Sequence, residues 1–231
     1  MRVDVLTIFP GIFPGPLGIG VVGRAIEQGL LEVTALDLRD WAEGRHRQVD
    51  DVPFGGGAGM VFKPEPLLGA VRSMRAADPR VRAILLGPQG RRFDQVVARE
   101  LAGEEHLLLV CGRYQGVDER ARAEIGEELS IGDYVLSGGE VAAMAVIEAT
   151  ARLLPGTLGS PESLTGETFA QPDGFEPPLY TRPADFEGRT VPEVLRSGDH
   201  AAIERWHREQ SEELRRRRRA GPELLAPLST T

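Results

Sequence analysis

The sequence predicts an α/β fold, with a mostly parallel sheet covered by helices and a small helical domain after it. Two observations support this prediction. Short apolar runs rich in β-branched residues alternate with helical patterns through the first two thirds of the chain. Glycine-rich segments follow some of these runs, at Gly87–Gly90, Cys111–Gly116 and Gly138–Gly139. Because ligands of parallel sheets bind beyond the carboxyl ends of the strands, these segments indicate a binding site.

The expected elements alternate regularly along the chain. The apolar runs predict strands at Val3–Ile8, Val33–Leu38, Val81–Leu86, Leu107–Val110 and around Ile131–Leu136. The spacing of apolar residues between and after them predicts helices at Gly20–Leu31, Pro64–Ala77, Asp94–Ala102, Asp118–Glu127 and Glu140–Leu154. Strands that alternate with helices are typical of a parallel sheet.

The alternation stops at Pro155–Pro183, a segment with six prolines. A loop of this length is usually functional or a linker. After it we expect a short helix at Val191–Leu195 and a longer one that is capped by Ser197 or Asp199 and runs to about Arg219. The predicted organisation is therefore a first domain at 1–158, a linker at 159–183 and a helical C-terminal domain at 184–231.

Composition restricts the location of the protein. The single cysteine, Cys111, excludes an intrachain disulfide and a multi-cysteine metal site, which fits a reducing compartment. Val5–Gly23 carries no charge, but its prolines and glycines cannot sustain a membrane-spanning helix. We expect a cytoplasmic protein without a membrane segment.

Charge leaves the question of a nucleic-acid partner open. The net charge is −8, yet a polyanion responds to local charge, and Arg215–Arg219 is strongly basic. This run is either an RNA contact or a solvated helix end that is stabilised by the helix dipole.

One glycine motif suggests a competing function. Gly18–Gly23 matches the dinucleotide-binding fingerprint, with Asp37 at the place of the acid that binds the ribose. In that motif the first glycine turns the chain directly from strand to helix, whereas here Phe9–Leu17, with three prolines, intervenes. A dinucleotide-dependent oxidoreductase is therefore a weak alternative. A second cluster, Gly55–Met60, lacks the Lys-Ser/Thr of a P-loop and is either a backbone-lined concavity or a flexible turn.

Seven short motifs together are much more specific. In order and spacing they resemble the bacterial tRNA (guanine-N1)-methyltransferases of the SPOUT superfamily over roughly residues 1–215. They are Arg45–Asp51, Gly55–Met60, Gly87–Gly90, Cys111–Arg120, Ser130–Glu140, Tyr180–Pro183 and Ser197–His200.

The resemblance implies a fold with a C-terminal trefoil knot in the sheet domain, and a homodimer that binds S-adenosylmethionine in the knot. It implies methylation of N1 of the guanosine 3′-adjacent to the tRNA anticodon, with tRNA bound by the C-terminal domain. It also suggests Mg²⁺, although the sequence shows no metal-ligand cluster. The matching cofactor positions are Leu86, Gly112, Ile131, Gly132, Asp133, Tyr134, Val135, Leu136 and Gly138. Glycine at such positions lets main chain approach a ligand closely.

The resemblance also assigns the chemistry. N1 of guanine must lose a proton, and the matching positions make Glu167 the general base and Arg152 the cation near O6. Gln115 and Arg113 match substrate contacts, but Arg113 could instead pair with Asp118 or Glu119.

Two of these residues depart from the family pattern. Glu167 stands where the family has Asp, and Gln115 where it has Glu. Because both changes affect the substrate half of the site, a catalytically impaired RNA-binding relative remains a third alternative.

Overall fold

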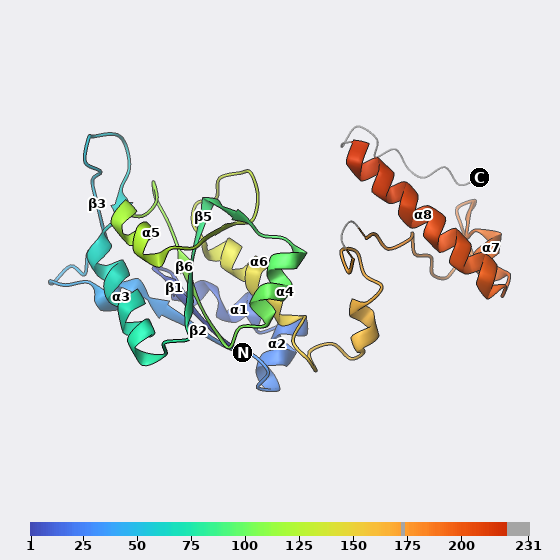
Figure 1. Ribbon diagram of the computed structural model, residues 1–231, viewed down its shortest axis with the longest axis horizontal. Coiled ribbons are helices and arrows are strands. Elements are labelled where there is room, and N and C mark those ends of the chain that lie inside the picture. Colours follow the sequence, from blue (N-terminus) through green and yellow to red (C-terminus); the bar gives the residue numbers. More distant parts are fainter. Residues whose placement is uncertain (172–173, 221–231) are drawn as a thin grey trace. The chain divides into compact units, whose positions relative to one another are not determined.

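The computed structural model describes residues 1–171 and 174–220 (Figure 1). The chain forms two compact units, Met1–Gly159 and Ser160–Thr231. Within the described part, no helix is both long enough and apolar enough to cross a membrane.

The first unit is built on a five-stranded parallel sheet with strand order β2-β1-β6-β5-β7. This confirms the predicted α/β class. The strands are β1 (Arg2–Thr7), β2 (Glu32–Asp37), β5 (Arg82–Arg92), β6 (His106–Cys111) and β7 (Glu128–Ser130). All residues of the central strand β6 are buried, as expected for a strand covered on both faces.

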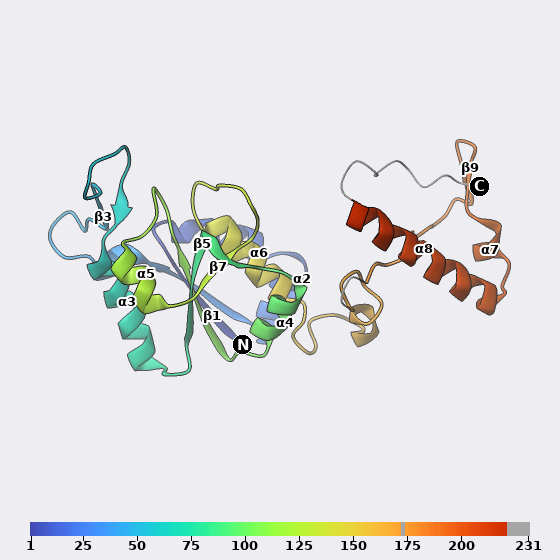
Figure 2. The same ribbon diagram turned by 45° about the horizontal axis from the view of Figure 1, so that its top comes forward.

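Helices cover both faces of this sheet (Figures 1 and 2). Along β6, Leu107 and Leu109 pack into one apolar cluster and Leu108 into the other, because alternate side chains point to opposite faces. The first cluster receives α2 (Gly20–Glu27), α4 (Gln95–Ala102) and α6 (Glu140–Ala151). The second receives α3 (Pro64–Ala77), α5 (Glu119–Ile125) and the 3₁₀ helix Leu38–Trp41.

Aspartate caps determine where two helices start. Oδ1 of Asp94 accepts hydrogen bonds from the N–H groups of Val96 and Val97, both at 2.9 Å, and α4 begins at the next residue. Asp118 caps α5 in the same way through the N–H of Arg120, at 2.9 Å. Both helices start one residue later than the apolar pattern predicted, because the cap residue itself is not helical.

The fifth strand was predicted in the wrong place. β7 ends at Ser130, and the predicted run Ile131–Leu136 is an irregular loop. The Ser130 hydroxyl donates to the carbonyl of Gly132 at 3.1 Å, and Gly132 has φ of 157°, which turns the chain out of the sheet. An apolar run therefore marked a loop whose side chains are partly exposed, with Val135 at 88%.

Two further features of the first unit were not expected. β3 (Asp50–Asp51) and β4 (Val61–Phe62) form a small antiparallel pair around the Gly55–Met60 cluster. Two short helices, the 3₁₀ helix Pro10–Ile12 and α1 (Pro14–Leu17), occupy the proline-rich segment before α2. Strands of two residues leave no periodicity for a sequence pattern to detect.

The second unit contains a short hairpin and two helices. β8 (Asp185–Phe186) pairs with β9 (Arg189–Thr190), and α7 (Glu193–Arg196) precedes α8 (His200–Ala220). Of the two predicted caps, Asp199 has the capping contact, because its Oδ1 accepts from the N–H of Ala202 at 3.0 Å. The start of the unit also holds a 3₁₀ helix at Pro161–Leu164.

Candidate active site

A cavity of about 410 Å³ lies at the carboxyl edge of the sheet. Its walls come from the ends of β5, β6 and β7 and from the loops that follow these strands. This is the edge where ligands of parallel sheets bind, and the volume lies in the range of about 300–1,000 Å³ that is usual for small-molecule sites.

Eight of the nine predicted cofactor positions line this cavity, namely Leu86, Gly112, Ile131, Gly132, Tyr134, Val135, Leu136 and Gly138. Asp133 is the exception. Its side chain is 91% exposed, and its carboxylate pairs with Arg92 at 3.4 Å. The structure therefore brings together residues from three separate loops, but it leaves Asp133 outside the lining.

Main chain forms much of the wall between the β6 loop and the start of α6. The N–H of Gly139 donates to the carbonyl of Gly112 at 2.8 Å. A Cβ atom added to Gly139 would lie 2.8 Å from Cα of Cys111, closer than side chains approach backbone. Glycine is required here because two backbone segments meet directly at the cavity.

A partly buried ion pair lies beside this wall and corrects one expectation. Arg113 pairs with Glu140 rather than with Asp118 or Glu119, with its Nε 3.0 Å from Oε1 and 3.2 Å from Oε2 of Glu140. Asp118 instead bonds Arg120, whose guanidinium and N–H hold the pKa of that carboxyl below its usual range. The guanidinium of Arg113 also lies over the ring of Phe9, 4.3 Å from its centroid.

A second polar group on the cavity wall was missed from the sequence. Nε of Arg122 donates to Glu128 at 2.7 Å, and the other carboxylate oxygen of Glu128 accepts from the N–H of Gln89 at 3.3 Å. Glu119 lines the cavity one helical turn before Arg122. The three-residue spacing of Glu119 and Arg122 on the predicted helix was the available signal for this face.

The predicted substrate residue Gln115 is exposed and lies against the Gly55–Met60 cluster. Its N–H donates to the carbonyl of Met60 at 3.0 Å, and a Cβ on Gly59 would come within 2.8 Å of its Cγ. Gly59 has φ of 95°, which favours glycine. The cluster therefore contacts the cavity-lining residue Gln115 through Gly59 and Met60, but none of its own residues lines the cavity, so both interpretations stay open.

Cys111 is a small buried residue. It is 2% exposed, and burial raises the pKa of its thiol far above the usual range, with the neighbouring Glu140 carboxylate adding to the effect. A thiol in this state is a poor nucleophile.

The two predicted catalytic residues belong to different units. Arg152 follows the last residue of α6 in the first unit. Glu167 lies in the second unit, where its carbonyl accepts from the N–H of Ala170 at 2.9 Å. Both side chains are partly buried.

The geometry of the dinucleotide motif is absent from Gly18–Gly23. The helices Pro10–Ile12 and α1 stand between β1 and α2, so no strand turns directly into the glycines. The oxidoreductase alternative therefore has no structural support. Among residues 1–171 and 174–220, no group of three or more His, Cys, Asp or Glu side chains could hold a metal ion, so the expected Mg²⁺ has no support either.

An open parallel α/β sheet with a glycine-walled cavity at its carboxyl edge is typical of enzyme domains that bind a small molecule. Comparison with known proteins narrows this class. The model of the family tRNA (Guanine-1)-methyltransferase TrmD matches residues 1–226.

Curated relatives agree over most of the chain. The tRNA (guanine-N(1)-)-methyltransferase of Syntrophotalea carbinolica is 54% identical over 211 residues, which cover 91% of this chain and 85% of the relative. The enzyme of the same name from Dictyoglomus turgidum is 49% identical over 231 residues, covering 100% and 92%. The one from Geobacter sulfurreducens is 52% identical over 227 residues, covering 97% and 91%. The chain belongs to the tRNA (guanine-1)-methyltransferase TrmD family.

Proposed function

We propose that this protein methylates N1 of the guanosine 3′-adjacent to the tRNA anticodon, with S-adenosylmethionine as the methyl donor. The observation that carries the proposal is the family match over residues 1–226, together with relatives of that activity at about half identity. It agrees with a cavity at the sheet edge where the family's cofactor positions meet.

The residues of the cavity fit this cofactor. Glycines 112, 132 and 138 leave main chain exposed along one wall, while Leu86 and Leu136 provide apolar surface for a planar base. When bound, S-adenosylmethionine supplies an electrophilic methyl group on its sulfonium. The protein's task is then to orient the acceptor guanine and to handle its proton.

Glu167 and Arg152 act on the acceptor guanine, one as a base and the other as a cation. Glu167 accepts the N1 proton of guanine, and a positioned general base of this kind contributes about 10²–10⁴-fold in rate. Arg152 stabilises the negative charge that develops on O6. Gln115 contacts the guanine, where its amide oxygen accepts from the exocyclic amino group, and Arg113 provides a cation beside it.

The finer features of the family follow as part of the same proposal. A trefoil knot is supported by the path of the chain: β7 is an edge strand beside β5, yet α6 returns to pack near β1 and β6. The proposal includes a homodimer, in which exposed apolar side chains such as those of Ile19 and Val141 would be covered. We assign the cofactor to residues 1–158 and tRNA binding to 184–231, joined by a linker at 159–183 that carries the base, in a cytoplasmic enzyme.

Methyl incorporation tests the proposal directly. Purified protein with labelled S-adenosylmethionine should methylate an unmodified tRNA transcript whose anticodon is followed by guanosine, and should spare a transcript with adenosine at that position. Binding of tRNA without any methyl transfer would favour the impaired RNA-binding relative. Transfer to both transcripts would contradict the assigned target.

A further inference from the structure

Glu140 is an unusually buried charge that the proposed mechanism does not use. The residue is 1% exposed and is the first residue of α6, where the helix dipole favours an anion. Its Oε1 accepts a hydrogen bond from the hydroxyl of Thr7 at 2.8 Å and one from Nε of Arg113 at 3.0 Å. A carboxylate removed from water in this way is costly unless its partners hold it firmly.

The partners of Glu140 come from two segments that are distant from it and from each other in the sequence. Thr7 ends β1 and also accepts from the N–H of Phe9 at 2.9 Å. Arg113 stands in the loop after β6, where its guanidinium lies over the Phe9 ring. The cluster Thr7–Phe9–Arg113–Glu140 therefore joins the ends of two central strands to the start of α6.

This cluster is in direct contact with the cavity wall. Arg113 and Gly138 form an isolated antiparallel bridge, and both residues line the cavity. A Cβ atom on Gly138 would lie 2.5 Å from Oε2 of Glu140 and 2.6 Å from Nε of Arg113. The ion pair thus packs onto Gly138 itself and supports main chain that borders the cavity.

The two residues of this ion pair differ in how many of their hydrogen-bonding atoms have partners. Glu140 uses both carboxylate oxygens, whereas Nη1 and Nη2 of Arg113 bond no acceptor in the part of the chain that the structure describes. A guanidinium fixed through Nε and stacked on an aromatic ring presents its terminal N–H groups in one direction. Glu140 therefore orients a cation at the cavity without occupying its donor edge.

We propose that Glu140 is a positioning residue of the methyl-transfer site, which sets the affinity for the methyl donor by holding, together with Arg113, the main chain of Gly138 in place. This inference rests on the proposed function. It predicts that neutralising Glu140 weakens cofactor binding beyond any effect on folding.

Calorimetric titration with S-adenosylmethionine tests it. Glu140→Gln keeps the shape but loses a charge-assisted bond, and its dissociation constant should rise about tenfold. In steady-state assays the loss should appear in KM for the methyl donor more than in kcat. Thr7→Val removes one hydrogen bond from Glu140 and should raise the dissociation constant in the same direction by a smaller factor.

Asp4→Asn provides the matched control. Asp4 is also a fully buried carboxylate, but it lies at the opposite edge of the sheet and bonds His106 and Arg2. This variant should lose thermal stability and keep the wild-type affinity. Equal affinity in wild type, Glu140→Gln and Thr7→Val would overturn the inference. A folded wild type that does not bind S-adenosylmethionine would instead overturn the proposed function.

Discussion

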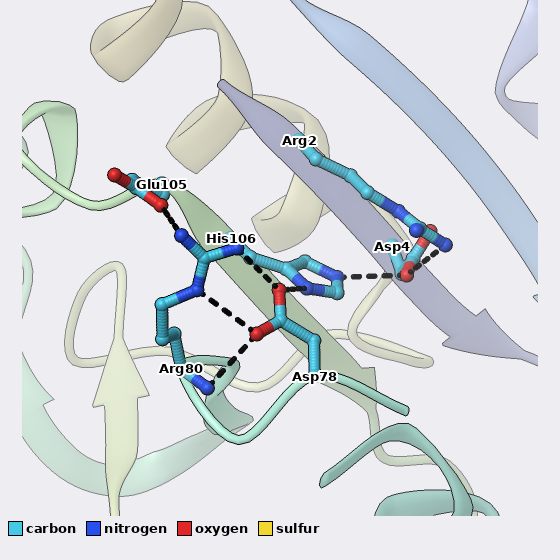
Figure 3. Close-up of polar contacts among 6 residues, drawn as sticks. All are labelled: Arg2, Asp4, Asp78, Arg80, Glu105 and His106. Carbon is cyan, nitrogen blue, oxygen red and sulfur yellow. Dashed lines mark hydrogen bonds and ion pairs between the residues drawn. The ribbon is translucent and has the colours of Figure 1, made fainter. Parts of the chain in front are cut away.

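The imidazole of His106 and the carboxylate of Asp4 join two central strands of the sheet, with Nε2 2.9 Å from Oδ2 (Figure 3). The other ring nitrogen, Nδ1, lies 3.1 Å from Oδ2 of Asp78 in the loop after α3. His106 is 3% exposed and Asp4 is fully buried. This polar group lies toward the amino ends of the strands, and none of Asp4, Asp78 and His106 lines the cavity.

Acid should weaken this group through Asp78. Hydrogen bonds from the N–H and the guanidinium of Arg80, and then from His106, lower the pKa of Asp78 from 3.8 to about 2. Because the pKa is lower in the folded state, the stabilisation is complete above about pH 4 and is lost as pH falls toward 2. Urea unfolding should show a larger free energy of unfolding for wild type than for Asp78→Asn at neutral pH, and this difference should disappear between about pH 4 and pH 2. A difference that stays constant down to pH 2 would contradict the assignment.

Removal of the proposed base should affect chemistry alone. Glu167→Ala should lower the single-turnover rate of methyl transfer by about 10²–10⁴-fold while S-adenosylmethionine still binds normally. Glu176→Ala is the matched control, because Glu176 is a carboxylate of the same proline-rich segment with no assigned role, and it should retain the wild-type rate. Equal losses in the two variants would mean that the segment needs charge rather than a base at position 167.

A methyl group on the cavity wall should disturb the ion pair behind it. Gly138→Ala brings a Cβ into contact with Glu140 and Arg113, and we expect weaker S-adenosylmethionine binding and a lower melting temperature. Gly159→Ala serves as the control, since no atom lies within 4 Å of its added Cβ. Calorimetry and thermal unfolding of both variants measure the difference. Unchanged S-adenosylmethionine binding in Gly138→Ala would contradict the prediction and would mean that Glu140 and Arg113 shift to accommodate the added methyl group.

The basic end of α8 gives a prediction about salt. Arg216 and Arg217 bond Glu213, both at 2.8 Å, and Arg218 lies over the ring of Phe169, so the run is partly engaged within its own unit. If the run neutralises tRNA phosphates, replacement of Arg215–Arg219 by Gln should reduce the slope of log affinity for tRNA against log salt. The expected reduction is roughly 0.7–0.9 for each phosphate that is no longer neutralised. An unchanged slope would leave the run as a solvated helix end.

Sequence patterns captured the elements whose side chains alternate or repeat. Periodicity predicted the helix Pro64–Ala77, which has one apolar face, and the strand β6, which is apolar on both faces. The alternation of such strands and helices predicted the α/β class. Ile131–Leu136 shows the limit of this reasoning. Its apolar residues line a cavity instead of a sheet, and the strand ends where Ser130 and Gly132 bond each other.

The loops that surround the cavity were predicted from family motifs and not from periodicity. The family motifs indicated the three loops that meet at the cavity, since their glycines stand at places where main chain needs room. The partner of Arg113 could not be read from spacing. Glu140 is 27 residues away, and the contact exists only because the chain returns from the edge strand β7 to the centre of the sheet.

The glycine wall of the cavity also bears on inhibition. A side chain that recognises a ligand can be exchanged for another, so a competing compound that relies on it can be escaped by one substitution. Peptide groups at Gly112 and Gly138 are present whichever residue the gene encodes, and a Cβ at Gly138 would collide with the Arg113–Glu140 pair. If the peptide group at Gly138 holds the methyl donor as proposed, a compound that binds it would leave the enzyme few single substitutions there that exclude the compound and still accept the donor.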